Sequence, residues 1–384
     1  MKIVFLYLHF NYVNNCATNL YTNLKYLNHK NQLIINVNIF DLEDIARAIK
    51  DADLLVVDAA IFNFEHWTPG VHKSIRTPQW RASNHYLKIQ DLILGSKNFK
   101  ILIAPFHDLH TPIFSSKYSN QEMGEVFQAL IWMYERGVKD IRNIKFHERE
   151  KWMQSHEKIQ KIYDDFTKSF PLRIEFLHSL DEHEFQIKNK SKYWDVNVPG
   201  IAYKERLIAL KSAREQELKI APFNSFEKVI HGAFKVNSKI INTENSLKMK
   251  DEIRKRNFRF SISHSKVNWS DGSLLGYPVR KYFEIPALRS ALVMSSFPGY
   301  EDYGFVDYEN CIITDADDFG QVAKKLIKND NLREKICTNA FNMVKRLHSS
   351  RARAQQITDT LIAISENSLI KASFSDGVYS IERK

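Results

Sequence analysis

The stretch that decides the fold reads GYPVRKYFEIPALRSALVMSSF and covers residues 276–297. Its first part has helical spacing, and its last part, ALVMSS, is a short apolar run of the kind that forms a buried strand. The helical part carries Arg280, Lys281, Glu284 and, near its middle, Pro286. Because a proline inside a helix removes a backbone hydrogen bond and kinks the chain, we expect Pro286 to turn the helix end toward the strand.

The N-terminal 110 residues show the same alternation of apolar strands and helices. CATNLYTNLKYLNH and LEDIARAIKDA are predicted as helices, and so, further on, is QEMGEVFQALIWMYERG (121–137). Short apolar strands separated by helices are typical of a parallel sheet that is covered on both faces. The predicted strands are KIVFLYLHF (2–10), LIINVNIF (33–40), DLLVVDAA (53–60) and KILIAPF (100–106).

Residues 188–200, KNKSKYWDVNVPG, are polar and end in Pro-Gly, which places a domain boundary there. Beyond it we expect strands at RFSISH (259–264) and CIIT (311–314), and one long helix from about Leu332 to Ile364. The last 18 or so residues are only weakly patterned. The fold class predicted is α/β, with two Rossmann-like domains facing each other across a cleft. The predicted units are an N-terminal domain of residues 1–195, a C-terminal domain of residues 196–365 and a C-terminal tail of residues 366–384.

Several common catalytic motifs are absent from the sequence. There is no GxxxxGKS/T phosphate loop, no GxSxG elbow and no CxxC pair. The first predicted strand is followed by NYVNNCATN, where a dinucleotide-binding turn would have glycines. These absences argue against a nicotinamide or flavin enzyme.

The cysteines and the apolar runs bear on the compartment. Cys16, Cys311 and Cys337 are few, odd in number and far apart, so they form neither a disulfide framework nor a metal cluster. A reducing cytoplasm fits this usage. No window approaches the ~18 consecutive apolar residues of a membrane span. We therefore expect a cytoplasmic protein that is soluble or, at most, bound peripherally to the inner face of the membrane.

The net charge of the 384-residue chain is +10, which suits nucleic acid, anionic lipid or small phosphorylated substrates. Residues 228–259 contain nine Lys and Arg against three acidic residues. They lack the glycine and aromatic interleaving of RNA-binding sheets, so we expect no nucleic-acid partner. The stretch forms either solvated helix faces or a face that lies against an anionic membrane.

The motif HDLH, residues 107–110, follows the predicted strand KILIAPF directly. Ligands of open α/β sheets bind at the carboxyl ends of strands, so the position favours a functional role. His107, Asp108 and His110 are the candidate catalytic residues, because a His beside an Asp supplies a base and a partner that orients it. The alternative is that Asp108 caps a turn and both histidines are surface residues.

The start of the helix in the opening stretch is a candidate anion site. Turn residues precede Pro278, which suits the first helical position, and a loop that enters a helix presents free backbone N–H groups. Arg280 and Lys281 in the first turn are unfavourable against the helix dipole unless an anion binds there. Glu284 is well placed to accept hydrogen bonds from a ribose diol. The alternative is a plain ion pair between Arg280 and Glu284, which are four residues apart.

These same residues carry a family resemblance. GYPVRKYFEIPA, followed by ALVMSS, the turn PGYEDYGF and the strand CIIT, resembles the C-terminal half of GT-B glycosyltransferases. The ending DADDFGQVAKKLIKNDNLREKICTNAFNMVKRLHSSRARAQQI is also similar to that family. VPGIAYKERL (198–207) resembles the segment that opens the second domain in one subgroup. The resemblance covers roughly residues 195–357.

The resemblance implies a donor site for a nucleotide-sugar in the C-terminal domain. In that family a Glu at the position of Glu284 binds the donor ribose. Basic residues and helix-start amides, here around Tyr277 to Lys281, neutralise the diphosphate, so that neither a metal nor another cofactor is expected. The donor-binding residues that the resemblance implies are Ser273, Gly276, Tyr277, Arg280, Lys281 and Glu284.

The function implied is transfer of a sugar from a nucleotide-activated donor to a glycan or lipid-linked acceptor, as in polysaccharide biosynthesis. Many retaining members have a second Glu where this chain has Gly276, so retention and inversion both stay open. In an inverting enzyme Asp108 or His107 would be the base. The alternatives are a nucleotide-sugar epimerase, a transferase of CMP-activated sugar acids, and a non-enzymatic binder of phospho-ligands or nucleic acid.

Overall fold

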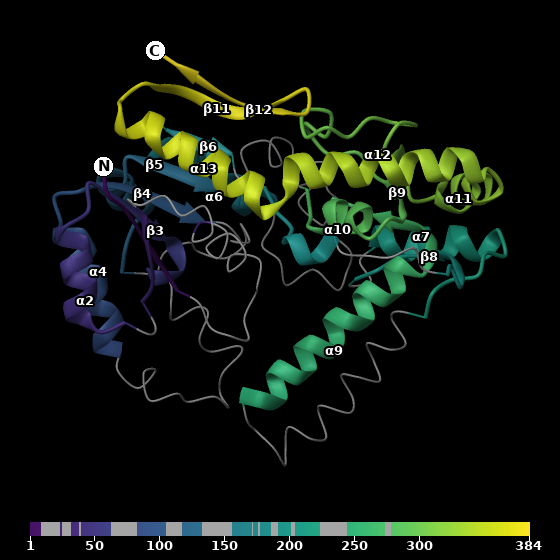
Figure 1. The fold of residues 1–384 in the computed structure, drawn as a ribbon, viewed down its shortest axis with the longest axis horizontal. Coiled ribbons are helices and arrows are strands. Elements are labelled where there is room, and N and C mark those ends of the chain that lie inside the picture. The colour runs from purple at the N-terminus through teal and green to yellow at the C-terminus, as the bar shows by residue number, and fades with distance from the viewer. Residues whose placement is uncertain are drawn as a thin grey trace.

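The computed structural model describes a large part of the chain in two α/β halves (Figure 1). The described residues are 1–8, 24, 32–37, 40–62, 83–104, 117–132, 156–170, 172–175, 177–185, 191–200, 204–222, 244–272 and 278–384.

The N-terminal half is built on a six-stranded parallel sheet with the strand order β2-β1-β3-β4-β5-β6. Apolar side chains on its two faces form two separate clusters, because the inner strands of the sheet are buried on both sides. The four strands expected within residues 2–106 are all present, and the expected helix at LEDIARAIKDA is confirmed as α2. The expected helix at CATNLYTNLKYLNH lies outside the described residues, apart from Leu24. The strands are β1 (Ile3–Tyr7), β2 (Gln32–Asn36), β3 (Leu54–Asp58), β4 (Phe99–Ala104), β5 (Ala129–Trp132) and β6 (Arg173–Glu175), and the helices are α2 (Leu42–Lys50), α4 (Ser83–Gly95), α5 (Asn120–Val126) and α6 (His156–Ser169).

The C-terminal half contains a four-stranded parallel sheet with the strand order β10-β9-β8-β7. Pro286 lies inside α10, which ends one residue later, and β9 begins at Ala291, as the sequence predicts. β7 falls within the polar stretch 188–200, where we expected only a domain boundary. The strands are β7 (Trp194–Asn197), β8 (Ser265–Ser270), β9 (Ala291–Met294) and β10 (Ile312–Ile313), and the helices are α7 (Lys204–Glu215), α9 (Glu244–Ser263), α10 (Lys281–Ala287), α11 (Phe319–Lys328) and α12 (Asp330–His348). None of the described helices is long and apolar enough to cross a membrane.

The expectation of one long helix from Leu332 to Ile364 is wrong, because the chain breaks at Ser349 between α12 and α13 (Ser350–Ser365). Ser349 has extended backbone angles, and its hydroxyl accepts a hydrogen bond from the Ala352 backbone N–H at 3.2 Å. It is therefore an N-cap, the usual role of serine at a helix start. Ala354, Ile357 and Leu361 on α13 share an apolar cluster with the N-terminal sheet, so the chain returns to its first half (Figure 1).

The last residues form a hairpin, β11 (Leu369–Ser375) and β12 (Val378–Arg383), which the weak sequence pattern did not predict. Phe374 on β11 is fully buried and contacts the Tyr303 ring edge-on at 5.6 Å between centroids. The same ring stacks on His348, with 5.6 Å between centroids. The hairpin is thus part of the packed structure.

Two expected elements are wrong for the same reason. RFSISH alternates like a strand, but it is the end of α9, and Phe260 is 44% exposed while Ile262 is fully buried. The expected helix at residues 121–137 ends at Val126, and the run Ala129–Trp132 is a central strand of the sheet. Short apolar runs are compatible with either structure, and the tertiary packing decides between them.

Candidate functional site

Two polar clusters lie beside α10, and the first is at the carboxyl ends of β7 and β8. It contains Gly200, Arg206, Asp271 and Lys281, which we call the carboxyl-edge cluster. Gly200 follows β7 and Asp271 follows β8 directly, while Arg206 and Lys281 come from the first turns of α7 and α10. Ligands of open parallel sheets bind at this edge, because the loops and helix starts gather there.

Arg206 and Asp271 form a buried, two-pronged ion pair. Arg206 Nε donates to Asp271 Oδ2 at 2.8 Å and Nη2 donates to Oδ1 at 2.7 Å. Their side chains are 5% and 4% exposed. Bidentate geometry of this kind holds a guanidinium in one fixed orientation. The pair therefore fixes the position of the Arg206 guanidinium beside Lys281.

Of the two cations in this cluster, Lys281 has the fewer negatively charged partners. Its ammonium donates to the Pro199 carbonyl at 3.1 Å, and among the described residues no carboxylate lies within ion-pair distance of it. Burial and the neighbouring Arg206 charge lower its pKa to about 7, although Asp271 and Glu284 act in the opposite direction. A buried ammonium in this state is stabilised by an added anion.

Gly200 gives the chain room to pass these cations. Its φ is +107°, a backbone conformation that side chains rarely adopt, and a Cβ there would lie 2.8 Å from Lys281 Nζ and 3.0 Å from Arg206 Nη1. Only glycine fits both the backbone angle and the space. The backbone after β7 is therefore held directly against the two cationic side chains.

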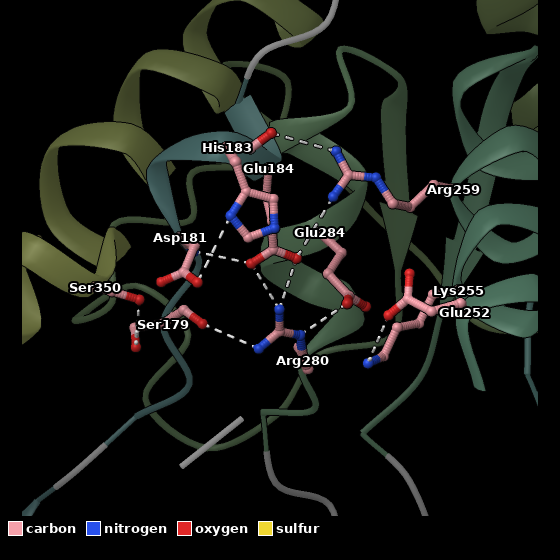
Figure 2. Close-up of polar contacts among 10 residues, drawn as sticks. All are labelled: Ser179, Asp181, His183, Glu184, Glu252, Lys255, Arg259, Arg280, Glu284 and Ser350. Carbon is pink, nitrogen blue, oxygen red and sulfur yellow. Dashed lines mark hydrogen bonds and ion pairs between the residues drawn. The ribbon is translucent and has the colours of Figure 1, made fainter. Parts of the chain in front are cut away.

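The second cluster is an ion-pair network around Arg280, formed by Glu184, Arg280 and Glu284 and drawn in Figure 2. Arg280 Nε donates to Glu284 Oε1 at 2.7 Å, and Nη2 donates to both Glu184 oxygens at 2.7 Å. Nη1 donates to the Ser179 carbonyl at 3.1 Å. The ion pair between Arg280 and Glu284, four residues apart, is thus present, as the alternative sequence interpretation had it.

Glu284 is a carboxyl group in a partly buried position, with a side chain that is 18% exposed. Burial raises its pKa, and the nearby Glu184 charge adds to this effect, while the Arg280 and Lys281 charges work against it. It lies one turn into α10, on the helix that also carries Lys281. A carboxyl group held there at one oxygen leaves the other available as a hydrogen-bond acceptor.

The structure describes half of the predicted donor-binding residues. Arg280, Lys281 and Glu284 lie together at the start of α10, which begins at Lys281 and not at Pro278. Ser273, Gly276 and Tyr277 lie outside the described residues, and so do the candidate catalytic residues His107, Asp108 and His110. Groups of His, Cys, Asp or Glu that could hold a metal ion are not found in the part of the chain that the structure describes.

Sequence reasoning missed four residues of the two clusters, and one of them is Gly200, which we used only as part of the Pro-Gly domain boundary. Arg206 is the Arg of VPGIAYKERL, which we used only for its family resemblance. Asp271 counted only as a turn residue before the helix. Glu184 has no local signal, because it lies 96 residues from its partner Arg280.

Comparisons with known proteins show which family and which solved structures the chain is similar to. Residues 204–359 match the model of a family described as glycosyl transferase-like. A structure of HepE from Anabaena in complex with UDP is similar over 94% of this chain and 100% of that chain, with a TM-score of 0.50 and 9% identity. A glycosyltransferase from Rickettsia africae covers 96% and 99% of the two chains, with a TM-score of 0.46 and 12% identity. No curated protein matches the sequence significantly.

The comparisons bear on the fold and on the C-terminal half of the chain. The chain is α/β with two Rossmann-like halves, the GT-B architecture, and both predictions are confirmed. Residues 204–359, which contain most of both clusters, form a glycosyl transferase-like domain. The chain thus has the GT-B fold, and its residues 204–359 are similar to the glycosyl transferase-like family, in agreement with the sequence resemblance.

Proposed function

We propose that the protein transfers a sugar from a nucleoside-diphosphate donor to a glycan or lipid-linked acceptor, and that the donor diphosphate binds at the carboxyl-edge cluster. The observation that carries this is the buried Lys281 ammonium at the carboxyl edge of the sheet, which donates to the Pro199 carbonyl and has no carboxylate within ion-pair distance among the described residues. A diphosphate beside it would supply the missing negative charge, and the charge that develops on the leaving group would be stabilised there. The fold-related HepE was solved in complex with UDP, which supports a nucleotide as a ligand of this fold.

Glu284 is proposed to accept hydrogen bonds from the donor ribose, and Arg280 to hold it in place. All three nitrogens of the Arg280 guanidinium have protein acceptors. We therefore propose that Arg280 mainly pairs with Glu284 and Glu184, and that stabilising the leaving group is its secondary role. The general base for the acceptor hydroxyl is proposed to be Asp108 or His107, and His110 is the third candidate of the same motif. Lys281 and Arg206 are cations of the protein itself, so we also propose that transfer needs no metal.

A thermal-shift screen tests the donor site. Wild-type protein and the Lys281→Met variant are heated with UDP, GDP, ADP or CDP, each with and without EDTA. Ligand that binds the folded state raises the melting temperature by mass action. We expect one diphosphate to stabilise the wild type equally well with EDTA, and the shift to be lost in Lys281→Met. No stabilisation of the wild type by any nucleotide would contradict the proposal.

Product analysis separates transfer from the alternatives. A transferase releases the nucleoside diphosphate only when an acceptor is present, apart from slow hydrolysis. An epimerase instead changes the sugar of the donor, and a transferase of CMP-activated sugar acids releases CMP. A non-enzymatic binder leaves the donor intact.

We further propose that α9 brings the enzyme to an anionic membrane, where a lipid-linked acceptor would reside. Met249, Ile253 and Phe260 follow helical spacing on one stripe and are 53%, 38% and 44% exposed. Ile262, on the opposite face, is buried in the core of the C-terminal half. Residues 228–259, with nine basic and three acidic residues, add the charge that anionic headgroups attract.

Vesicle sedimentation tests this surface. We expect the protein to pellet with vesicles of phosphatidylglycerol and phosphatidylcholine, weakly or not at all with phosphatidylcholine alone, and less in high salt. The Met249→Ser, Ile253→Ser, Phe260→Ser variant should stay in solution, while the exposed Val306→Ser control should still pellet. Equal pelleting of the wild type and all variants would overturn the membrane assignment. A dimer in sedimentation analysis that the triple-serine variant no longer forms would overturn it as well.

A further inference from the structure

The chain passes between the two halves twice, first in the segment between β6 and β7, which we call the connector, and again at the junction of α12 and α13. The connector contacts that junction. The Leu180 N–H donates to the His348 carbonyl at 3.0 Å, and the Ser350 N–H donates to the Leu180 carbonyl at 2.7 Å. The connector therefore pairs with the junction of α12 and α13. Immediately after this pairing comes the 3-10 turn η5 (Glu182–Phe185), which carries Glu184.

Glu184 reaches from the connector into the ion-pair network of α10. Both of its oxygens accept from Arg280 Nη2 at 2.7 Å, and Oε2 also accepts from the Asp181 backbone N–H at 2.8 Å. Arg259 on α9 lies 3.9 Å away on the other side. The Glu184 side chain is only 13% exposed. Figure 2 shows it between Arg259 and Arg280, with the Glu284 carboxyl beside the Arg280 guanidinium.

The orientation of Arg280 is set mostly from the connector. One edge of its guanidinium is held by Glu184 and the Ser179 carbonyl, which are both connector residues, and the remaining Nε points at Glu284. Because a guanidinium is planar and rigid, fixing one edge fixes the direction of the other. The Arg280 Nε that holds the Glu284 carboxyl is therefore positioned by the connector and not by Glu284 itself.

We propose that Glu184 is a positioning residue of the donor site: from the connector it fixes Arg280, and through Arg280 it orients the carboxyl of Glu284 toward the donor. This rests on the proposed function, in which Glu284 binds the ribose. It assigns a role in donor binding to a residue that lies outside the matched domain of residues 204–359.

The charges around Glu284 support the same assignment. Burial would raise the pKa of Glu184, but Arg280 and the Asp181 N–H outweigh it and hold that pKa below its usual range. Glu184 therefore stays charged and helps to raise the pKa of Glu284, which also faces Arg280 and Lys281. Further out, Arg259 faces Glu184, and buried His178 near Arg280 has a pKa lowered to about 3, so it stays neutral. Removing the Glu184 charge should thus lower the pKa of Glu284.

The test compares Glu184→Gln with Glu182→Gln, a control from the same 3-10 turn whose side chain is exposed. Binding of UDP, GDP, ADP and CDP to the full-length protein is measured by calorimetry. We expect the Kd of the preferred diphosphate to rise about tenfold in Glu184→Gln and to stay within about twofold in Glu182→Gln. The acid limb of the binding profile should move to lower pH only in Glu184→Gln, because Glu284 then ionises more easily.

Stability is measured in parallel, because breaking a partly buried ion pair also destabilises the fold. Glu184→Asp, which keeps the charge, should recover part of the affinity. A Glu184→Gln variant that melts earlier but binds with an unchanged Kd and pH profile would show a structural role only and overturn the proposal. If the wild type binds no nucleotide at all, the proposed function fails instead, so the two failures are distinguishable.

Discussion

At the scale of single residues, Lys281 is the group whose charge depends most on its surroundings. In the folded protein its pKa is lowered from the ordinary value of 10.5 to about 7, chiefly by burial and then by Arg206. Between about pH 7 and 10.5 Lys281 is therefore mostly protonated in the unfolded chain and mostly neutral in the folded chain. Stability contributed by Lys281 rises with pH across that window and is lowest below pH 7.

The same pKa predicts how nucleotide affinity depends on pH. A diphosphate needs the charged ammonium, so binding takes up a proton once the pH exceeds about 7. We expect the affinity for the preferred diphosphate to fall about tenfold between pH 7 and 8.5. Calorimetry in buffers of different ionisation enthalpy would detect the proton uptake. Lys281→Arg, whose charge persists, should show no such fall; a wild-type affinity that is flat across this range would contradict the assignment.

At the scale of elements, α13 belongs to the C-terminal half in sequence but packs with the N-terminal sheet. Its fully buried Leu361 shares a cluster with Phe5, Val56 and Ile101. The extended backbone at Ser349 separates it from α12 and allows this change of partner.

Leu361→Ala should therefore destabilise the N-terminal half. Loss of a fully buried leucine costs about 2–5 kcal/mol, because a cavity remains. We expect urea unfolding, followed by hydrogen exchange of β1 and β3, to show the loss of protection there. Leu207→Ala on α7, a leucine that is 41% exposed, is the matched control and should change stability little. A loss confined to the C-terminal sheet would show that α13 does not support the first half.

How far the sequence predicts these elements depends on whether the deciding contact is local. The buried runs of β1, β3 and β4 are continuous, so their pattern alone predicted them. The pair between Arg280 and Glu284 could also be predicted, because it follows helical spacing. RFSISH and ALIW could not be assigned, since only their long-range packing separates helix from strand. Glu184 was not predictable for the same reason, as its partner lies 96 residues along the chain.

At the scale of the whole molecule, the terminal hairpin packs where several segments meet. Phe374 contacts Tyr303 and His348 of the C-terminal half, and the Arg353 guanidinium of α13 lies 4.9 Å from its ring centre. The Tyr303 hydroxyl in turn donates to the Glu175 carboxylate on β6, in the N-terminal sheet. One buried ring thus borders both halves.

Phe374→Ala should lower the stability of both halves together. Removing a buried phenylalanine costs about 3–5 kcal/mol. We expect the melting transitions of N-terminal and C-terminal tryptophans, Trp132 and Trp269, to shift down by a similar amount. The control Val378→Ala changes a residue that is 60% exposed in the same hairpin and should leave both transitions in place. A shift of only one transition would mean that the ring serves one half alone.

The return of the chain to its first half also decides how a chimera of this protein should be designed. A chimera that joins the first 195 residues of this protein to the remainder of a distant relative would place a foreign α13 on the native N-terminal sheet. The exchange should therefore be made with two crossovers, so that residues 350–384 travel with the N-terminal half and the donor-binding half is inserted between them. The N-terminal half that packs as one unit is therefore built from two separate stretches of the sequence.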